Sequence, residues 1–166
     1  MKTIVIGLGN PILTDDGIGV KVAYEVEAAL NPEDNKDVTV TEASVGGLRL
    51  MELMIGYDRA IIIDALISQN GILPGTIKRM TFEDLRKISP TQHSASAHDT
   101  TLVTAYDLGI ELGFKLPEKI VIFAVEVENV LEFSDQPTPA VAHSIPQVTA
   151  EVLKELVLGG NGYDFT

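Results

Sequence analysis

The sequence predicts one three-layer α/β domain over residues 1–166, with a mostly parallel, twisted sheet of about five strands and helices on both faces. Two observations lead to this prediction. Short β-branched runs alternate with longer segments whose apolar residues recur at helical spacing, as βαβ units require. The chain also shows no repeat, low-complexity linker or break in composition, which favours a single domain of ordinary size.

Five segments have the pattern of strands. Lys2–Gly7 is rich in β-branched residues, and residues 59–64 are almost entirely apolar, as expected for a central parallel strand covered on both faces. The remaining strands are expected at residues 38–41, at residues 119–125 and, at the edge of the sheet, at residues 76–80. Because ligands of such sheets gather where strands end, Gly7, Asp64 and the segment after Val125 are expected at the functional edge.

Helices are expected from about Ile18 to Leu30, over residues 48–55, over about residues 99–113 and from Thr138 onwards. Thr14 is the expected N-cap of the first helix. Thr138 and Pro139 have the pattern of an N-cap followed by the first helical position, and Pro146 is expected to kink that helix. Residues 84–97 show no clear period, which indicates a loop.

Composition narrows the class of protein. A net charge of −12, from 12 Lys and Arg against 24 Asp and Glu, opposes nucleic-acid binding, which depends on cations that neutralise phosphates. The absence of cysteine excludes a disulfide framework, a thiolate metal site and a cysteine nucleophile. The sequence shows no signal-peptide pattern and no apolar run near the ~20 residues that span a bilayer. We therefore expect a cytoplasmic protein with no membrane or nucleic-acid partner.

The turn after the first strand carries the strongest motif, Gly7-Leu8-Gly9-Asn10-Pro11 followed by Asp15-Asp16-Gly17-Ile18-Gly19. A dinucleotide-binding turn would need a third glycine or a small residue where this chain has Ile12. Two aspartates at a helix start would also repel a pyrophosphate. Carboxylates in a first helical turn stabilise a helix by ~0.3–1 kcal/mol each. A structural role is therefore the alternative for both Asp15 and Asp16. For Asp15 the structural role is favoured.

Asp16, Asp64 and His98 form a candidate metal site. Asp16 follows the carboxyl end of a strand, and Asp64 closes an apolar strand. A lone buried carboxylate is costly, so Asp64 needs a partner, and a bound cation is one such partner. An N-cap role is the alternative for Asp64. Among the three histidines, His143 is expected to face water, while His98 precedes a helix and His93 lies deeper in the expected loop. Two carboxylates and one imidazole suit zinc, nickel, iron or manganese.

The first motif resembles the amino-terminal signature of the hydrogenase maturation endopeptidases. The resemblance continues through Gly47, Leu50, Ile62-Ile63-Asp64-Ala65, Pro74-Gly75-Thr76, His98, Leu116-Pro117 and Ala124-Val125-Glu126. It implies an endopeptidase that removes the C-terminal extension of the large-subunit precursor of a nickel-containing hydrogenase after nickel insertion. It also implies that Asp16, Asp64 and His98 are the metal ligands and the catalytic residues, with His93 as the alternative third ligand. The precursor is the expected partner, and a monomer is expected.

The resemblance leaves two mechanisms open. In the first, the three side chains recognise nickel already seated in the precursor, so that cleavage depends on insertion. In the second, another divalent metal held by the same residues polarises the scissile carbonyl or lowers the pKa of a bound water towards ~7. A serine nucleophile is disfavoured because the chain has no Gly-x-Ser-x-Gly elbow, and Ser44, Ser94 and Ser96 are expected in turns and loops. Glu126 and Glu128 are expected beyond the last strand, at the same cleft.

Two other functions stay open at this point. The opening Gly7–Pro11 also resembles that of the peptidyl-tRNA hydrolases. Those proteins continue with a glycine and a Thr-Arg-His-Asn segment, whereas this chain has Ile12 and Thr14-Asp15-Asp16-Gly17. The acidic charge also opposes tRNA binding. The second alternative is a non-enzymatic, metal-binding regulatory domain with the same fold.

Overall fold

The computed structural model describes residues 1–67, 71–88 and 97–160. The strands in these ranges are β1 (Thr3–Leu8), β2 (Val38–Ala43), β3 (Arg59–Ile67), β4 (Ile77–Thr81) and β5 (Lys119–Val127). The helices are the short 3-10 helix η1 (Thr14–Gly17) and the α-helices α1 (Ile18–Ala29), α2 (Gly47–Met54), α3 (Phe82–Ile88), α4 (Ala97–Glu111) and α5 (Pro139–Gly160).

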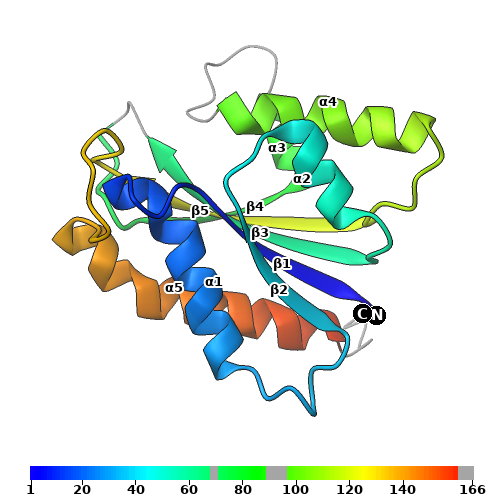
Figure 1. Cartoon of the computed structure of the whole chain (residues 1–166), viewed down its shortest axis with the longest axis horizontal. Helices are drawn as coiled ribbons and strands as arrows, with labels where there is room; N and C mark the ends of the chain where they lie inside the picture. Colours follow the sequence, from blue (N-terminus) through cyan, green and yellow to red (C-terminus); the bar gives the residue numbers. More distant parts are fainter. Residues whose placement is uncertain (68–70, 89–96, 161–166) are drawn as a thin grey trace.

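The five strands form one sheet in the order β2-β1-β3-β5-β4. The first four strands are parallel to one another, and β4 pairs antiparallel with β5 at the edge. Figure 1 shows α1 and α5 on one face of this sheet and α2, α3 and α4 on the other. The predicted three-layer fold with a mostly parallel sheet of five strands is therefore confirmed.

Strand alternation divides the core into two layers. On β1, Ile4 and Ile6 pack against the helices α2, α3 and α4, whereas Val5 packs against α1 and α5. The central strand β3 alternates in the same way, with Ile62 on the first face and Ile61 on the second. Both faces of these strands are covered, which explains why their sequences are apolar without interruption.

The two predicted helix starts have different outcomes. Thr14 is not an N-cap, because its φ of 49° is left-handed and its hydroxyl donates to the carbonyl of Glu132 at 2.6 Å. The helix α5 does begin at Pro139, as predicted, and it continues as one helix through Pro146.

The helix α3 occupies part of the region that was expected to be a loop. Its start is fixed by a reciprocal pair: the Thr81 N–H donates to Asp84 Oδ2 at 2.9 Å, and the Asp84 N–H donates to Thr81 Oγ1 at 3.2 Å. This Thr-x-x-Asp spacing is a capping-box pattern that was readable in the sequence. Within the described ranges, no helix combines the length and the apolar character needed to cross a bilayer.

Candidate active site

The site begins where β1 separates from β3. The last pair that joins these strands is Gly7–Ile63, while β3 and β5 stay paired as far as Ile67–Val127. Asp64 is thus the first residue of β3 beyond its pairing with β1, and it is buried. It does not end its strand, and no helix follows it, so both the predicted strand end and the N-cap alternative are wrong.

Glycines bring α1 directly onto the backbone at this edge. A Cβ on Gly19 would lie 2.3 Å from the carbonyl oxygen of Ile63 and 2.4 Å from that of Leu8. A Cβ on Gly7 would lie 2.3 Å from the Gly19 carbonyl oxygen. These contacts leave no room for a side chain, so the helix start packs against both strands. The segment η1, immediately before α1, is held at the carboxyl edge as a consequence.

Asp16 lies on η1 over the end of β1. Its Oδ2 accepts the backbone N–H of Asn10 at 2.8 Å. Gly9 has a φ of 129° and leaves space for the Asp16 carbonyl. A Cβ on Gly9 would lie 1.8 Å from that carbonyl oxygen. Contacts join η1 to β3. Leu8 and Asp64 are the residues that follow the last β1–β3 pair, Gly7–Ile63. Shared binding of an ion by Asp16 and Asp64 stays a prediction.

Asp15 has a different role from its neighbour. It is fully buried, and its Oδ2 accepts the N–H groups of Glu128 at 3.2 Å and Asn129 at 3.0 Å. Its Oδ1 accepts the N–H of Thr138 at 2.7 Å, and the Thr138 hydroxyl also donates to this carboxylate. Asp15 therefore ties η1 to the β5–α5 loop and to the start of α5, which confirms a structural role.

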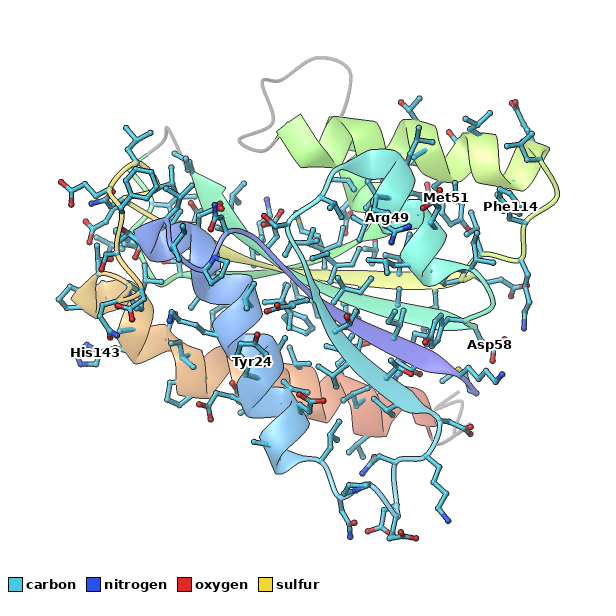
Figure 2. The ribbon with its side chains drawn as sticks, in the orientation of Figure 1. Tyr24, Arg49, Met51, Asp58, Phe114 and His143 are labelled. Atoms are coloured by element: carbon cyan, nitrogen blue, oxygen red, sulfur yellow. The ribbon has the colours of Figure 1, made fainter. Side chains whose placement is uncertain are left out.

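The histidines are described unequally. His98 is the second residue of α4, and Figure 1 shows α4 beginning at the same end of the sheet as η1. Its side chain and all of His93 fall outside the described part of the chain. His143 is exposed on α5 and points away from the body of the protein in Figure 2, as predicted. Among the side chains that are described, no three His, Asp or Glu groups could hold an ion together.

Glu126 lies inside β5 and is buried, so its predicted position beyond the last strand is wrong. Asp64 pairs with Ala124 and Leu66 pairs with Glu126. Paired and alternate residues share a face of a sheet, which puts the Asp64 and Glu126 side chains on the same face of neighbouring strands. Only the exposed Glu128 follows the strand, as predicted. The sequence pattern missed Glu126 because a charged residue near the end of an apolar run suggests that the strand has ended.

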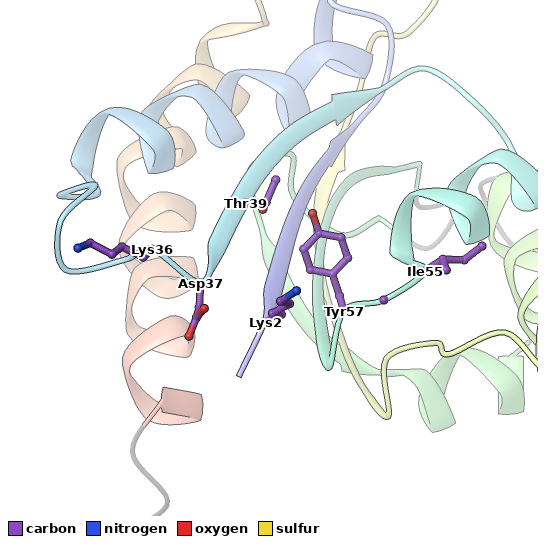
Figure 3. A pocket seen from close by; sticks show the side chains of 7 residues that line it. Lys2, Lys36, Asp37, Thr39, Ile55 and Tyr57 are labelled. Carbon is purple, nitrogen blue, oxygen red and sulfur yellow. The ribbon is translucent and has the colours of Figure 1, made fainter.

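A polar hollow of about 320 Å³ lies at the opposite edge of the sheet. It is lined by Lys2, Lys36, Asp37, Thr39, Ile55, Gly56 and Tyr57, and Figure 3 shows their side chains around it. These residues surround the amino ends of β1 and β2. Since parallel sheets bind ligands at their carboxyl edge, this hollow is not the candidate site.

The three-layer α/β fold with its closely packed carboxyl edge is shared with solved endopeptidases. The structure is similar to the hydrogenase maturating endopeptidase HybD from Escherichia coli, with a TM-score of 0.80 and 28% sequence identity over 96% of this chain and 94% of that one. It also resembles the [NiFe] hydrogenase maturation protease HybD from Thermococcus kodakarensis in fold, with a TM-score of 0.68 at 21% identity, covering 94% of this chain and 99% of that one.

The chain belongs to the hydrogenase maturation protease family, whose model matches residues 20–155. It is 24% identical to the hydrogenase expression/formation protein HupD of Rhizobium leguminosarum over 93% of this chain and 74% of the relative. It is 33% identical to the hydrogenase 2 maturation protease of Escherichia coli over 55% of this chain and 57% of the relative. The protein is therefore a peptidase. The peptidyl-tRNA hydrolase and non-enzymatic alternatives do not fit this finding.

Proposed function

We propose that this peptidase removes the C-terminal extension of a nickel-containing hydrogenase large-subunit precursor after nickel insertion, and that Asp16, Asp64 and His98 recognise the substrate's nickel. The names of its relatives support the substrate class. What supports the site is that Asp16 accepts the Asn10 N–H just after β1, and that Asp64 is the first residue of β3 beyond its pairing with β1.

The two carboxylates suit this role because the backbone orients each of them. Asp16 Oδ2 accepts the Asn10 N–H at 2.8 Å, and Asp64 Oδ1 accepts the Ala65 N–H at 2.8 Å. A carboxylate fixed through one oxygen loses little freedom when it meets a cation. Carboxylate oxygens with one imidazole nitrogen also form a donor set that nickel accepts.

Recognition of a substrate-borne metal makes insertion a condition for cleavage. A precursor without nickel would bring no cation to the edge where Asp16 and Asp64 lie, and the scissile segment would not be held there. The orienting groups are backbone amides of Asn10 and Ala65, so the site is ready before the substrate binds. The second mechanism, with another divalent metal held by the same residues, predicts cleavage that does not depend on the nickel content of the precursor.

The test incubates the purified protein with nickel-loaded and with metal-free precursor and measures the mass of the product. We expect a shortened product from the loaded precursor alone, and a loss of at least about 100-fold in rate for Asp16→Asn and for Asp64→Asn. Equal cleavage of the two precursors would contradict nickel recognition.

A matched control separates the site from a general loss of charge. Asp34 is exposed in the loop between α1 and β2, so Asp34→Asn removes the same charge far from the carboxyl edge and should cleave at the wild-type rate. Urea unfolding of all three variants checks the fold. If Asp64→Asn unfolded at much lower urea than the wild type, its inactivity would indicate a structural role instead.

A further inference from the structure

Three large apolar side chains stand in solvent beside the candidate site. Ile12, in the turn after β1, is 54% exposed, and Leu131 and Phe133, in the β5–α5 loop, are 86% and 82% exposed. Leu131 and Phe133 are the most exposed large apolar residues in the described part of the chain. We call these three residues the apolar rim. Exposed apolar side chains that gather at one place mark an interaction surface.

The three residues are neighbours because the two loops pair with each other. Leu13 and Ser134 form a parallel bridge, in which the Ser134 N–H donates to the Ile12 carbonyl at 3.0 Å and the Thr14 N–H donates to the Ser134 carbonyl at 2.9 Å. Ile12 and Phe133 each precede a member of this bridge, so they lie side by side. Leu131 extends the surface along the same loop.

Hydrogen bonds hold the loop that carries Leu131 and Phe133. The Asn129 side-chain oxygen accepts the N–H of Leu131 at 3.2 Å, and Thr14 Oγ1 donates to the Glu132 carbonyl at 2.6 Å. Asp15 binds the same loop at Asn129. The apolar side chains are thus presented by an ordered backbone. A preorganised surface of this kind loses little conformational entropy when a partner binds.

Asn10 connects the rim to the acids. Its side-chain oxygen accepts the Ile12 N–H at 3.2 Å, and its own N–H donates to Asp16 Oδ2 at 2.8 Å. The rim therefore adjoins Asp16 at the carboxyl edge.

We propose that the apolar rim is the docking surface for the precursor protein beside its scissile segment, an inference that rests on the proposed function. The exposed acids Glu128, Glu132 and Asp135 lie in the same loop as the rim. A complementary partner surface therefore presents apolar side chains flanked by Lys or Arg. A second copy of this chain would bring acidic loops and two net charges of −12 together, which disfavours self-association through the rim.

The test compares the wild type with the double variant Leu131→Ser/Phe133→Ser, using purified nickel-loaded precursor. Affinity is measured by surface-immobilised binding and cleavage by product mass. We expect Kd and KM to rise about tenfold or more, with kcat changed less than about twofold, since docking contacts are the same in ground and transition states. Binding should also weaken as salt is raised, because the charges at the rim are exposed.

The control is Val157→Ser/Leu158→Ser, which removes two apolar side chains that are 65% and 64% exposed on α5 and should leave Kd unchanged.

An unchanged Kd for the rim variant would overturn the docking surface while leaving the proteolysis intact. Absence of cleavage by the wild type would contradict the proposed function, and the Kd comparison would still test the rim. A wild-type dimer that the rim variant converts to monomer would assign the rim to self-association and overturn the proposal. Affinity that is independent of salt would overturn the basic partner surface.

Discussion

The two ends of the sheet both bury charge, and they use it differently. At the amino end, Arg59 is only 1% exposed and donates from Nη1 to the Glu155 carbonyl and from Nη2 to the Leu156 carbonyl, each at 3.2 Å. At the carboxyl end, Asp15 accepts several backbone N–H groups, whereas the half-buried Asp16 accepts that of Asn10. Charges that satisfy several backbone groups hold the fold together, whereas Asp16 accepts a single backbone N–H and is the proposed ligand.

The amino end shows what a purely structural charge looks like. Burial lowers the pKa of Arg59, and the nearby Glu155 opposes that shift. Glu155 pairs with Arg79 at 2.9 Å, which joins β4 to α5. Arg59 thereby joins the start of β3 to the last turns of α5. Arg59 is the first residue of β3, whereas Asp64 lies beyond the pairing of β3 with β1, so variants at these two positions should separate stability from cleavage.

The largest loss of stability is expected from Asp15→Ala. The variant leaves the N–H groups of Glu128, Asn129 and Thr138 without their acceptor, and each donor left unsatisfied by such a change costs about 1–3 kcal/mol where it is buried. Urea unfolding measures the change in the free energy of unfolding. Thr138→Val, which removes only the hydroxyl, is the milder comparison. A loss below about 1 kcal/mol for Asp15→Ala would contradict its structural role.

Gly19→Ala should lower both stability and cleavage. The added Cβ would meet the carbonyl oxygens of Ile63 and Leu8 at 2.3 and 2.4 Å, and overpacking of this kind costs about 1–3 kcal/mol. Because backbone cannot yield easily, α1 shifts away from the strands and carries Asp16 with it. Cleavage of the loaded precursor is measured at a temperature where the variant is still folded. Full activity there would show that the position of α1 does not control the site.

Gly159→Ala makes the corresponding change at the amino end. Its Cβ would lie 1.2 Å from Arg59 Nη1, so the guanidinium must leave its place against α5, at a cost of about 1–2 kcal/mol. Thermal unfolding should show the loss, while kcat and KM on the precursor should match the wild type. A change in cleavage as large as that of Gly19→Ala would remove the distinction between the two ends.

The smallest effect is expected from Asp107→Asn on α4. Arg86 hydrogen-bonds this carboxylate and lowers its pKa. A lowered pKa contributes stability that is present above the unfolded pKa of about 3.9 and is lost as the pH falls through the folded value. The pair is half exposed, so solvent reduces its contribution to about 0.2–1 kcal/mol. The free energies of unfolding of the wild type and Asp107→Asn are measured at pH 7 and near pH 3. The difference between them should shrink at the lower pH, and a difference that stays constant would contradict the ion pair.

The fold was predictable because the buried strands β1, β3 and β5 are apolar on both faces, which leaves a local signature in the sequence. The role of Asp15 was predictable only in kind, because its partners Glu128 and Thr138 are distant in the chain and meet it only after folding. Glu126 was misplaced for the same reason, since its burial depends on neighbouring strands. The antiparallel direction of β4 also depends on tertiary contacts that no local pattern encodes.

The most direct test of nickel recognition is the nickel K-edge absorption spectrum of the loaded precursor, frozen with the protein before cleavage is complete. If Asp16 and Asp64 reach the metal, the spectrum should gain light-atom scattering in the wild-type mixture, and this gain should shrink with Asp16→Asn. A spectrum identical to that of the precursor alone, in a mixture shown to contain the complex, would contradict nickel recognition by these carboxylates.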